Sequence, residues 1–485
     1  MRQPRLFALS ALSALLAPAL LLPAACESSS SPSAAPFTFE AGPGFEAGPP
    51  PEAGPLPLED AGVDAADTAP PPPKGVTVTV VDGLTPKADV RVISQDATGA
   101  VIGDAKTDAT GKLTIATAPS TVTVLTSSFS APTPVSFLAV TDGDNLVVRI
   151  PLNIDESTVG TYSVTFTAGM AGQSTRAQAF VNGRCNNTTT DSSMLLLVGV
   201  VPSCLTAANA ILAVGSNSDF VLDGFAFKNS VAAPAANTTS AVTLPVWTTP
   251  GTTTLSATNT PGGQASMSAS LSMIANGASF AAAADKASGP VNSVAGQGYR
   301  TATGFADAYQ SWIRSVDDVT DQVETSIIRR EATTAPAAAT LAAVDFTTAL
   351  PYVTAAAVDT TTAARPIVTV TSDKPLTSVD AGLVVLSWIT ASEATGTWTF
   401  VVPASAAATF KAPALPADAI AFTPVGGVIA ASAAFFEATQ IPGYTEAKLL
   451  PVSPGTNFAL FAGSQALPAN GTVRLTTWAP RLPIP

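Results

Sequence analysis

Short runs of alternating β-branched residues, separated by turn residues, recur along this chain and constrain its fold more than any other feature. Val76–Val81 reads Val-Thr-Val-Thr-Val-Val and is followed by the dipeptide Asp82-Gly83. Ala88–Ile93 and Thr121–Leu125 alternate in the same way. Successive side chains of a strand point to opposite faces, so each run predicts a strand with one buried face. Short strands at this spacing predict an antiparallel β-sandwich.

The same signal continues to the C-terminal end. Clear strand runs lie at Thr161–Thr167, Pro366–Thr371, Leu383–Trp388, Thr397–Val402 and Thr472–Trp478. A length of 485 residues allows two or three such units at about 150 residues each. We therefore predict an all-β chain of tandem antiparallel sandwiches, Ig-like or transthyretin-like. The predicted domains are 75–152, 153–290 and 291–485.

The first of these domains carries the pattern of a known module. Ala88-x-Val90-x-Val92 and Thr107-Asp108-x-x-Gly111-Lys112-Leu113 resemble the carboxypeptidase-regulatory-like (transthyretin-like) sandwich. The family often has a Pro-x-Gly-x-Tyr step before its next strand, whereas here Pro119 is followed by Ser-Thr-Val. The resemblance covers about 75 residues and implies a structural module without catalytic residues.

One segment, 309–330, fits two structures. Apolar residues spaced four, three, four and four apart fit one face of a helix; they are Trp312, Val316, Val319, Val323 and Ile327. Alternation around the acidic stretch 317–321 fits a hairpin instead. The β-branched residues and the all-β setting favour the hairpin.

The N-terminal residues read as an export signal. Arg2 and Arg5 precede an apolar run, Leu6–Leu22, and the small residues before Cys26 complete a cleavage site. This resembles a bacterial lipoprotein signal peptide, residues 1–25, with its lipobox, although Pro23 stands where Leu is usual. The resemblance implies lipid on Cys26 and a membrane anchor. The alternatives are an ordinary secretory signal and an uncleaved anchor.

The residue after Cys26 bears on the destination of a lipoprotein. The usual sorting rule retains proteins with Asp at this position in the inner membrane, and here the residue is Glu27. The expected location is therefore the bacterial outer membrane, on either its periplasmic or its surface face.

Residues 26–74 have the composition of a linker. The tetrapeptide Glu-Ala-Gly-Pro begins at Glu40, Glu46 and Glu52, and the stretch ends in four prolines at 70–73. Such a segment buries too little apolar surface to fold. We predict a disordered stalk between membrane and sandwiches.

Composition excludes several functions. The chain contains no histidine, which excludes Ser-His-Asp and Cys-His nucleophilic systems and His-ligated zinc or iron sites. A formal net charge of −13 repels phosphate backbones, so we expect no nucleic-acid partner. No motif calls for a cofactor.

Two cysteines remain after Cys26. Cys185 and Cys204 form an even pair in an exported chain, which predicts one disulfide. The alternative is half of a metal site, which the absence of histidine and of further cysteines disfavours. We predict no metal.

Clusters of acidic residues are the remaining candidates for catalytic or metal-binding sites. Asp142-Gly-Asp-Asn145 suits either a tight turn or a calcium loop, and the turn is favoured because the EF-hand pattern is missing. The densest cluster comprises Asp317, Asp318, Asp321 and Glu324. Two of these could form a glycosidase pair, but such pairs normally come from separate strands, so a solvated turn is favoured.

Five tryptophans could stack on sugars or belong to the core. Trp388 and Trp398 flank a predicted hairpin and are the weak candidates for sugar stacking. Together these features predict a non-enzymatic envelope lipoprotein with a structural, adhesive or binding role. The sequence does not identify its ligand, which could be a protein or a glycan. The alternative is a carbohydrate-binding or glycan-degrading surface protein.

Overall fold

The computed structural model confirms an all-β fold. It describes residues 75–480 apart from 84, 129–130, 151–156, 168–173, 190–194, 207, 218–221, 261–264, 285–293, 295, 318–322, 333–337, 363, 390–394, 405–408, 425–427, 455–466 and 469. The predicted signal peptide and stalk lie outside these residues. None of the helices in the described part is long and apolar enough to cross a membrane.

The N-terminal sandwich, residues 76–150, packs two sheets around a core of valines. Alternate residues of the first strand, Val76, Val78 and Val80, are fully buried, as the sequence pattern predicts. One sheet contains β1 (Val76–Asp82), β2 (Thr85–Pro86), β5 (Lys112–Ile115) and β10 (Asn145–Ile150). The other contains β3 (Arg91–Gln95), β4 (Val101–Lys106), β6 (Thr121–Leu125) and β9 (Val135–Leu138), and a small hairpin is formed by β7 (Ser127–Ser128) and β8 (Ala131–Pro132).

The second sandwich, residues 160–244, has a core of its own around Tyr162 and Val198. One sheet contains β11 (Gly160–Phe166), β14 (Leu196–Val200) and β17 (Thr239–Leu244). The other contains β12 (Arg176–Val181), β13 (Cys185–Thr189), β15 (Asn209–Ser216) and β16 (Leu222–Val231), with the 3-10 turn η2 (Pro202–Cys204) between β14 and β15.

The third sandwich, residues 251–345, has a more aromatic core that includes Phe280, Tyr299, Phe305 and Tyr309. One sheet contains β18 (Gly251–Leu255), β22 (Ala283–Ala284), β23 (Gln297–Thr301) and β26 (Ala338–Thr340), with a short pair, β19 (Ala257–Thr258) and β27 (Val344–Asp345), after it. The other contains β20 (Ala265–Ala275), β21 (Ala278–Ala281), β24 (Ala308–Asp317) and β25 (Val323–Ala332).

The fourth sandwich, residues 353–478, follows the 3-10 turn η3 (Phe346–Thr348). One sheet contains β28 (Val353–Asp359), β29 (Ile367–Ser372) and β32 (Thr409–Lys411). The other contains β30 (Ala381–Ile389), β31 (Thr395–Val402), β33 (Val428–Ala438) and β34 (Thr472–Trp478). Two short helical segments, η5 (Ala417–Phe422) and α1 (Tyr444–Ala447), lie in its connections.

The first and last strands of the N-terminal and second sandwiches pair in parallel. β1 runs parallel to β10 from Thr77↔Asn145 to Asp82↔Ile150, and β11 runs parallel to β17. β18 also pairs in parallel with β26 in the third sandwich. The prediction of antiparallel sheets therefore holds for most pairs but not for these closing pairs.

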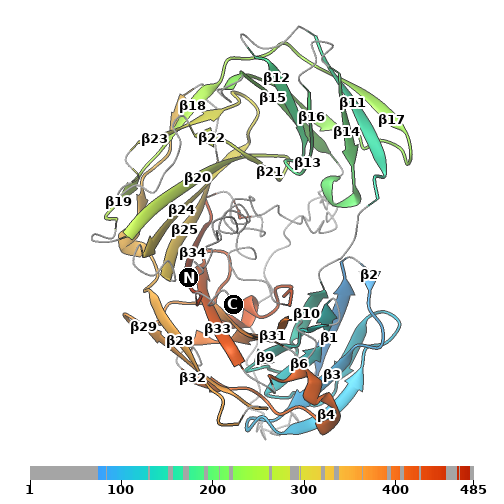
Figure 1. The fold of residues 1–485 in the computed structure, drawn as a ribbon, viewed down its shortest axis with the longest axis vertical. Coiled ribbons are helices and arrows are strands. Elements are labelled where there is room, and N and C mark those ends of the chain that lie inside the picture. Colours follow the sequence, from blue (N-terminus) through green and yellow to red (C-terminus); the bar gives the residue numbers. More distant parts are fainter. Residues whose placement is uncertain are drawn as a thin grey trace, which may run out of the picture.

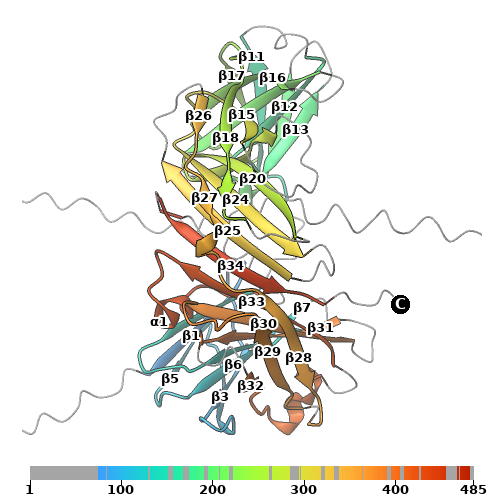
Figure 2. The same cartoon turned by 90° about the vertical axis from the view of Figure 1, so that its left-hand side faces the viewer.

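Three sandwiches are joined edge to edge into one twelve-stranded sheet. Its order is β21-β20-β24-β25-β34-β33-β30-β31-β9-β6-β3-β4. The third sandwich meets the fourth through β25 and β34, and the fourth meets the N-terminal one through the parallel pair β31 and β9. Figures 1 and 2 show the second sandwich at the opposite end of the long axis from the N-terminal one.

The domain boundaries therefore differ from those expected. The predicted boundary at residue 290 falls between β20 and β24, which pair over ten residues inside one sheet. Residues 291–485 span part of the third sandwich and all of the fourth. The ambiguous segment 309–330 is a hairpin, because β24 and β25 pair from Ala308↔Ala332 to Val316↔Glu324.

The larger sheet of the fourth sandwich is covered on both faces. Val384 and Leu386 point into the core of that sandwich, whereas Leu383 and Phe436 belong to the cluster that contains the N-terminal valines. The apolar run in β30 follows from this position, since a strand buried on both faces needs no polar alternation. The N-terminal and fourth sandwiches thus share one core.

Candidate functional site

The two cysteines predicted to pair are joined in the structure. The disulfide links Cys185, at the start of β13, to Cys204 in η2, 19 residues further along the chain. The side-chain amide of Asn182 donates to the Cys204 carbonyl oxygen at 2.7 Å and so orders the turn beside the bond. The bridge ties β13 to the connection between β14 and β15, and it leaves neither cysteine as a free thiol.

Trp388 and Trp398 do not present a face to a sugar. Both rings lie in the core of the fourth sandwich, with exposed fractions of 2% and 0%. The indole N–H of Trp398 donates to the Ser136 hydroxyl of β9 at 2.9 Å, across the junction with the N-terminal sandwich. The prediction of sugar stacking at these residues is wrong because the strands that carry them are covered on both faces.

A different tryptophan lies beside a surface hollow. Trp478, at the end of β34, lines a hollow of about 250 Å³ together with small residues of β28 and β33. The other lining residues are Ala356, Val358, Thr360, Ala430, Ala431 and Pro480. Most of the other lining side chains are small, and the indole forms part of the wall. Trp478 is thus the tryptophan best placed to contact a ligand here.

Two members of the acidic cluster at 317–324 lie on the paired strands β24 and β25. Asp318 and Asp321 lie outside the described residues, and Asp317 ends β24. Glu324 lies on β25, with its carboxylate 3.8 Å from the guanidinium of Arg314. Burial raises the pKa of the Glu324 carboxyl, and the nearby Arg314 opposes that rise.

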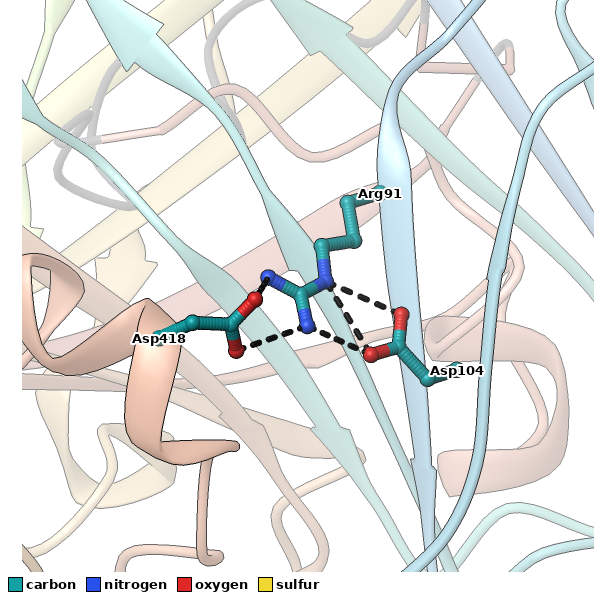
Figure 3. A network of polar contacts seen from close by, with 3 residues as sticks. All are labelled: Arg91, Asp104 and Asp418. Atoms are coloured by element: carbon teal, nitrogen blue, oxygen red, sulfur yellow. Dashed lines mark hydrogen bonds and ion pairs between the residues drawn. The ribbon is translucent and has the colours of Figure 1, made fainter.

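An exposed ion-pair network joins the N-terminal and fourth sandwiches. Figure 3 shows the Arg91 guanidinium between two carboxylates, Asp104 of β4 and Asp418 of η5. Its Nε lies 2.9 Å from Asp104 Oδ1, and its Nη1 lies 2.9 Å from Asp418 Oδ2. These hydrogen bonds hold the pKa of both carboxyls below the usual range. A planar guanidinium suits two carboxylates in this way, so the network aligns η5 on the outer strands.

The Asp142–Asn145 segment is a turn, as the favoured interpretation held. Gly143 has a φ of 86°, and the Asp144 carboxylate accepts from the Thr141 N–H at 2.7 Å. The counter-charge of Asp144 is a lysine, Lys448, whose Nζ lies 2.7 Å from Oδ2. Within the described residues no group of three His, Cys, Asp or Glu side chains could hold a metal ion.

Lys448 is the residue that sequence reasoning missed. It follows α1 in the apolar segment Ala447-Lys-Leu-Leu450 and is 1% exposed. A single lysine among apolar residues, in a chain with only 12% charged residues, was the available signal. Its partner could not be read from the sequence, because the two residues meet only through the fold.

Comparison with known proteins identifies no family for this chain. No family model matches it, and no curated protein is significantly similar. Among solved structures, the Bacillus anthracis TIE protein aligns at 9% identity over 49% of this chain, with a TM-score of 0.14. The aligned part spans 45% of that protein's chain. So low a TM-score carries no argument about fold or function.

Proposed function

We propose that this protein is a non-enzymatic envelope lipoprotein, anchored through Cys26, that serves as a rigid arm for structural or adhesive display. The observation that supports this most directly is the twelve-stranded sheet, which joins three sandwiches by main-chain pairing rather than by linkers. Domains connected only by linkers move relative to one another, whereas shared strands and a shared core hold them in one orientation.

The junction between the N-terminal and fourth sandwiches is reinforced beyond the paired strands. The Arg365 guanidinium donates to the Thr98 carbonyl oxygen at 2.8 Å, and the Ala414 N–H donates to the Gly99 carbonyl oxygen at 2.8 Å. On the other side of the N-terminal sandwich, Val452 pairs with β10 through an isolated bridge to Val148. A sandwich held on two sides suits a role in which a ligand surface is kept at a fixed distance from an anchor.

The absence of histidine and the structural use of the carboxylates support a non-enzymatic role. Asp96 and Asp108 accept hydrogen bonds within their own turns, and Asp104 and Asp418 share Arg91. The resemblance of the sequence of residues 75–152 to transthyretin-like sandwiches also supports a structural role. In the proposed protein, these carboxylates stabilise turns and the junction between two sandwiches, and they do not take part in a reaction.

Cell fractionation tests the anchor. In the proposed protein, Cys26→Ala moves from the membrane fraction to the soluble exported fraction, while the parent stays in the outer membrane. Glu27→Asp is the matched variant, because it keeps the lipid and should shift the protein to the inner membrane. If Cys26→Ala remains in the membrane as the parent does, lipid anchoring at this residue is wrong.

Carbohydrate recognition is the second candidate, and the hollow beside Trp478 favours it. An indole face next to small side chains is a surface on which a sugar ring can stack. A glycan array with residues 75–485 tests this, with Trp478→Ala expected to abolish any signal. Val246→Ala, at an exposed residue of the second sandwich, is the control. Equal binding by Trp478→Ala and parent would remove the hollow as the binding site.

A further inference from the structure

Lys448 and Asp144 form an ion pair sealed inside the protein. The ammonium nitrogen lies 2.7 Å from Asp144 Oδ2, and the two side chains are 1% and 5% exposed. The other polar contacts of Lys448 Nζ are the Thr141 hydroxyl at 2.9 Å and the Ala139 carbonyl oxygen at 3.3 Å. The Tyr444 ring lies over the ammonium, with its centroid 5.5 Å away.

This pair connects two sandwiches that lie far apart in the sequence. Asp144 precedes β10 of the N-terminal sandwich, and Lys448 follows α1 of the fourth. Both positions border the shared apolar cluster, which includes Leu146, Ala447 and Val452. Removing two charges from water is unfavourable unless their attraction and hydrogen bonds compensate.

We propose that Lys448 and Asp144 condense to an intramolecular amide, which cross-links the N-terminal and fourth sandwiches covalently. After proton transfer within the pair, the neutral Nζ attacks Cγ of Asp144 and forms the C–N bond. The bond from Cγ to one carboxyl oxygen breaks, and that oxygen leaves as water with two of the three ammonium protons. The third proton stays on the amide nitrogen, so no oxidant, reductant or co-reactant is needed.

The fold supplies the geometry for this step. Nζ is within hydrogen-bond distance of the carboxyl group, close to the separation of about 3–3.5 Å at which oriented groups react. The Thr141 N–H donates to Oδ2 at 2.7 Å, and the Thr141 hydroxyl lies 3.1 Å from Oδ1. Donors fixed on the carboxyl oxygens stabilise the negative charge that develops on them during attack.

The same arrangement favours the amide in its equilibrium with the ion pair. Amide formation is unfavourable between free molecules in water, but oriented groups in one molecule reach effective concentrations of roughly 10⁵–10⁸ M. The buried site also withholds the water that hydrolysis would need. The Tyr444 hydroxyl donates to the Val401 carbonyl oxygen at 3.1 Å, and this hydrogen bond fixes the Tyr444 ring over Nζ.

Peptide mapping of the full-length protein tests the proposal. The protein is denatured, reduced and digested with trypsin, and the peptides are identified by mass spectrometry. The expected product is a branched peptide in which 113–149 is joined to 412–474, lighter by one water than its two parts and uncleaved after Lys448. Linear peptides ending at Lys448, together with unmodified 113–149, would overturn the proposal.

Two variants complete the test. Lys448→Arg keeps the positive charge but cannot form this amide, so its map should contain only linear peptides. Lys87→Arg is the control, because Lys87 pairs with Asp82 at 3.1 Å on the surface, and this variant should keep the branched peptide. The parent map decides the question even if Lys448→Arg fails to fold. A branched peptide that persists in Lys448→Arg would show that the link does not involve Lys448.

Discussion

At the scale of residues, one four-residue turn occurs twice in the N-terminal sandwich and is built in the same way each time. Asp-Ala-Thr-Gly occupies Asp96–Gly99 and Asp108–Gly111. In both turns Oδ1 of the aspartate accepts the threonine N–H at 2.8 Å and the threonine hydroxyl at 2.7 Å. The following glycines have φ values of 76° and 71°, which other residues adopt only with strain.

These hydrogen bonds predict a loss of stability in acid. They lower the pKa of Asp96 and Asp108, with the threonine hydroxyl as the main cause. A carboxyl with a lowered folded-state pKa stabilises the fold above its unfolded pKa, about 3.9, and this contribution disappears as the pH falls below that value. The melting temperature of residues 75–485 should therefore fall between about pH 5 and pH 3. Asp108→Asn should reduce the size of that fall, whereas an unchanged pH profile would contradict the role of this turn.

Gly111→Ala should destabilise the protein by about 2 kcal/mol or more, because it combines left-handed strain with a steric clash. An added Cβ would lie 2.5 Å from the Val80 carbonyl oxygen and 2.9 Å from the Lys87 nitrogen. Gly277→Ala is the matched control, since its φ is 78° and nothing lies within 4 Å of the added atom. Urea unfolding of the three proteins gives the comparison. Equal losses for both variants would show that the clash is relieved without cost.

Sequence patterns predicted the residues whose roles are local and missed those whose roles depend on distant partners. The turn at Asp142–Asn145 and the cysteine pair were both predicted. Trp388 and Trp398 are predicted to flank a hairpin and also to form a sugar site, since nothing near them in sequence indicates that β28, β29 and β32 pack over that face of their sheet. Lys448 was overlooked for the same reason, because Asp144 is its partner only in the folded chain.

At the scale of elements, alternation located most strands correctly and the hairpin signals were stronger than the helical spacing. β24 and β25 form the hairpin that the β-branched residues favoured. The turn between β20 and β21 consists of Asn276 and Gly277, both with positive φ, which is the sequence preferred for a two-residue hairpin. In β30 the buried run from Ala381 to Leu386 obscures the alternation, because both faces are covered.

Reduction of the Cys185–Cys204 bond should lower the stability of the second sandwich by about 3 kcal/mol, the value expected for a closed loop of this length. The bond ties the start of β13 to η2, and this sandwich has its own core. The measurement is thermal unfolding with and without reductant. Cys185→Ala/Cys204→Ala should reproduce the reduced curve and should not respond to reductant. Identical melting of the oxidised and reduced protein would contradict this prediction.

At the scale of the molecule, the sequence predicted the fold class but not the way in which the sandwiches are combined. The edge pairs β25–β34 and β31–β9 join segments that are distant in sequence, and no local pattern marks which strand edges will meet. β20 and β24 pair across the predicted boundary at residue 290, so both strands lie in one sheet. Shared edges also hide strand surfaces that would otherwise invite pairing with other chains.

The shared core predicts different behaviour for two isolated pieces. Residues 75–152 alone would expose the edge of β9 and the valines that contact the fourth sandwich, so this fragment should be unfolded or much less stable than in the intact protein. Residues 157–250 keep Trp247, the inner core and the disulfide of the second sandwich, so this fragment should be the more stable of the two, although Ala210, Leu212 and Phe225 lose their packing against the third sandwich. Circular dichroism melting of both fragments gives the answer. A cooperative transition of residues 75–152 at the temperature of the whole protein would contradict the shared core.

The parallel pairing of β1 with β10 sets how the N-terminal sandwich would respond to a pulling force. The chain enters β1 at Val76 and leaves β10 at Ile150, so tension applied at these two points drives the strands along each other in opposite directions. All the hydrogen bonds between the two strands then resist this sliding at the same time, in shear, instead of breaking one after another. β11 and β17 have the same arrangement in the second sandwich. Tension applied to either sandwich through these strand ends would therefore load it in its mechanically strong direction.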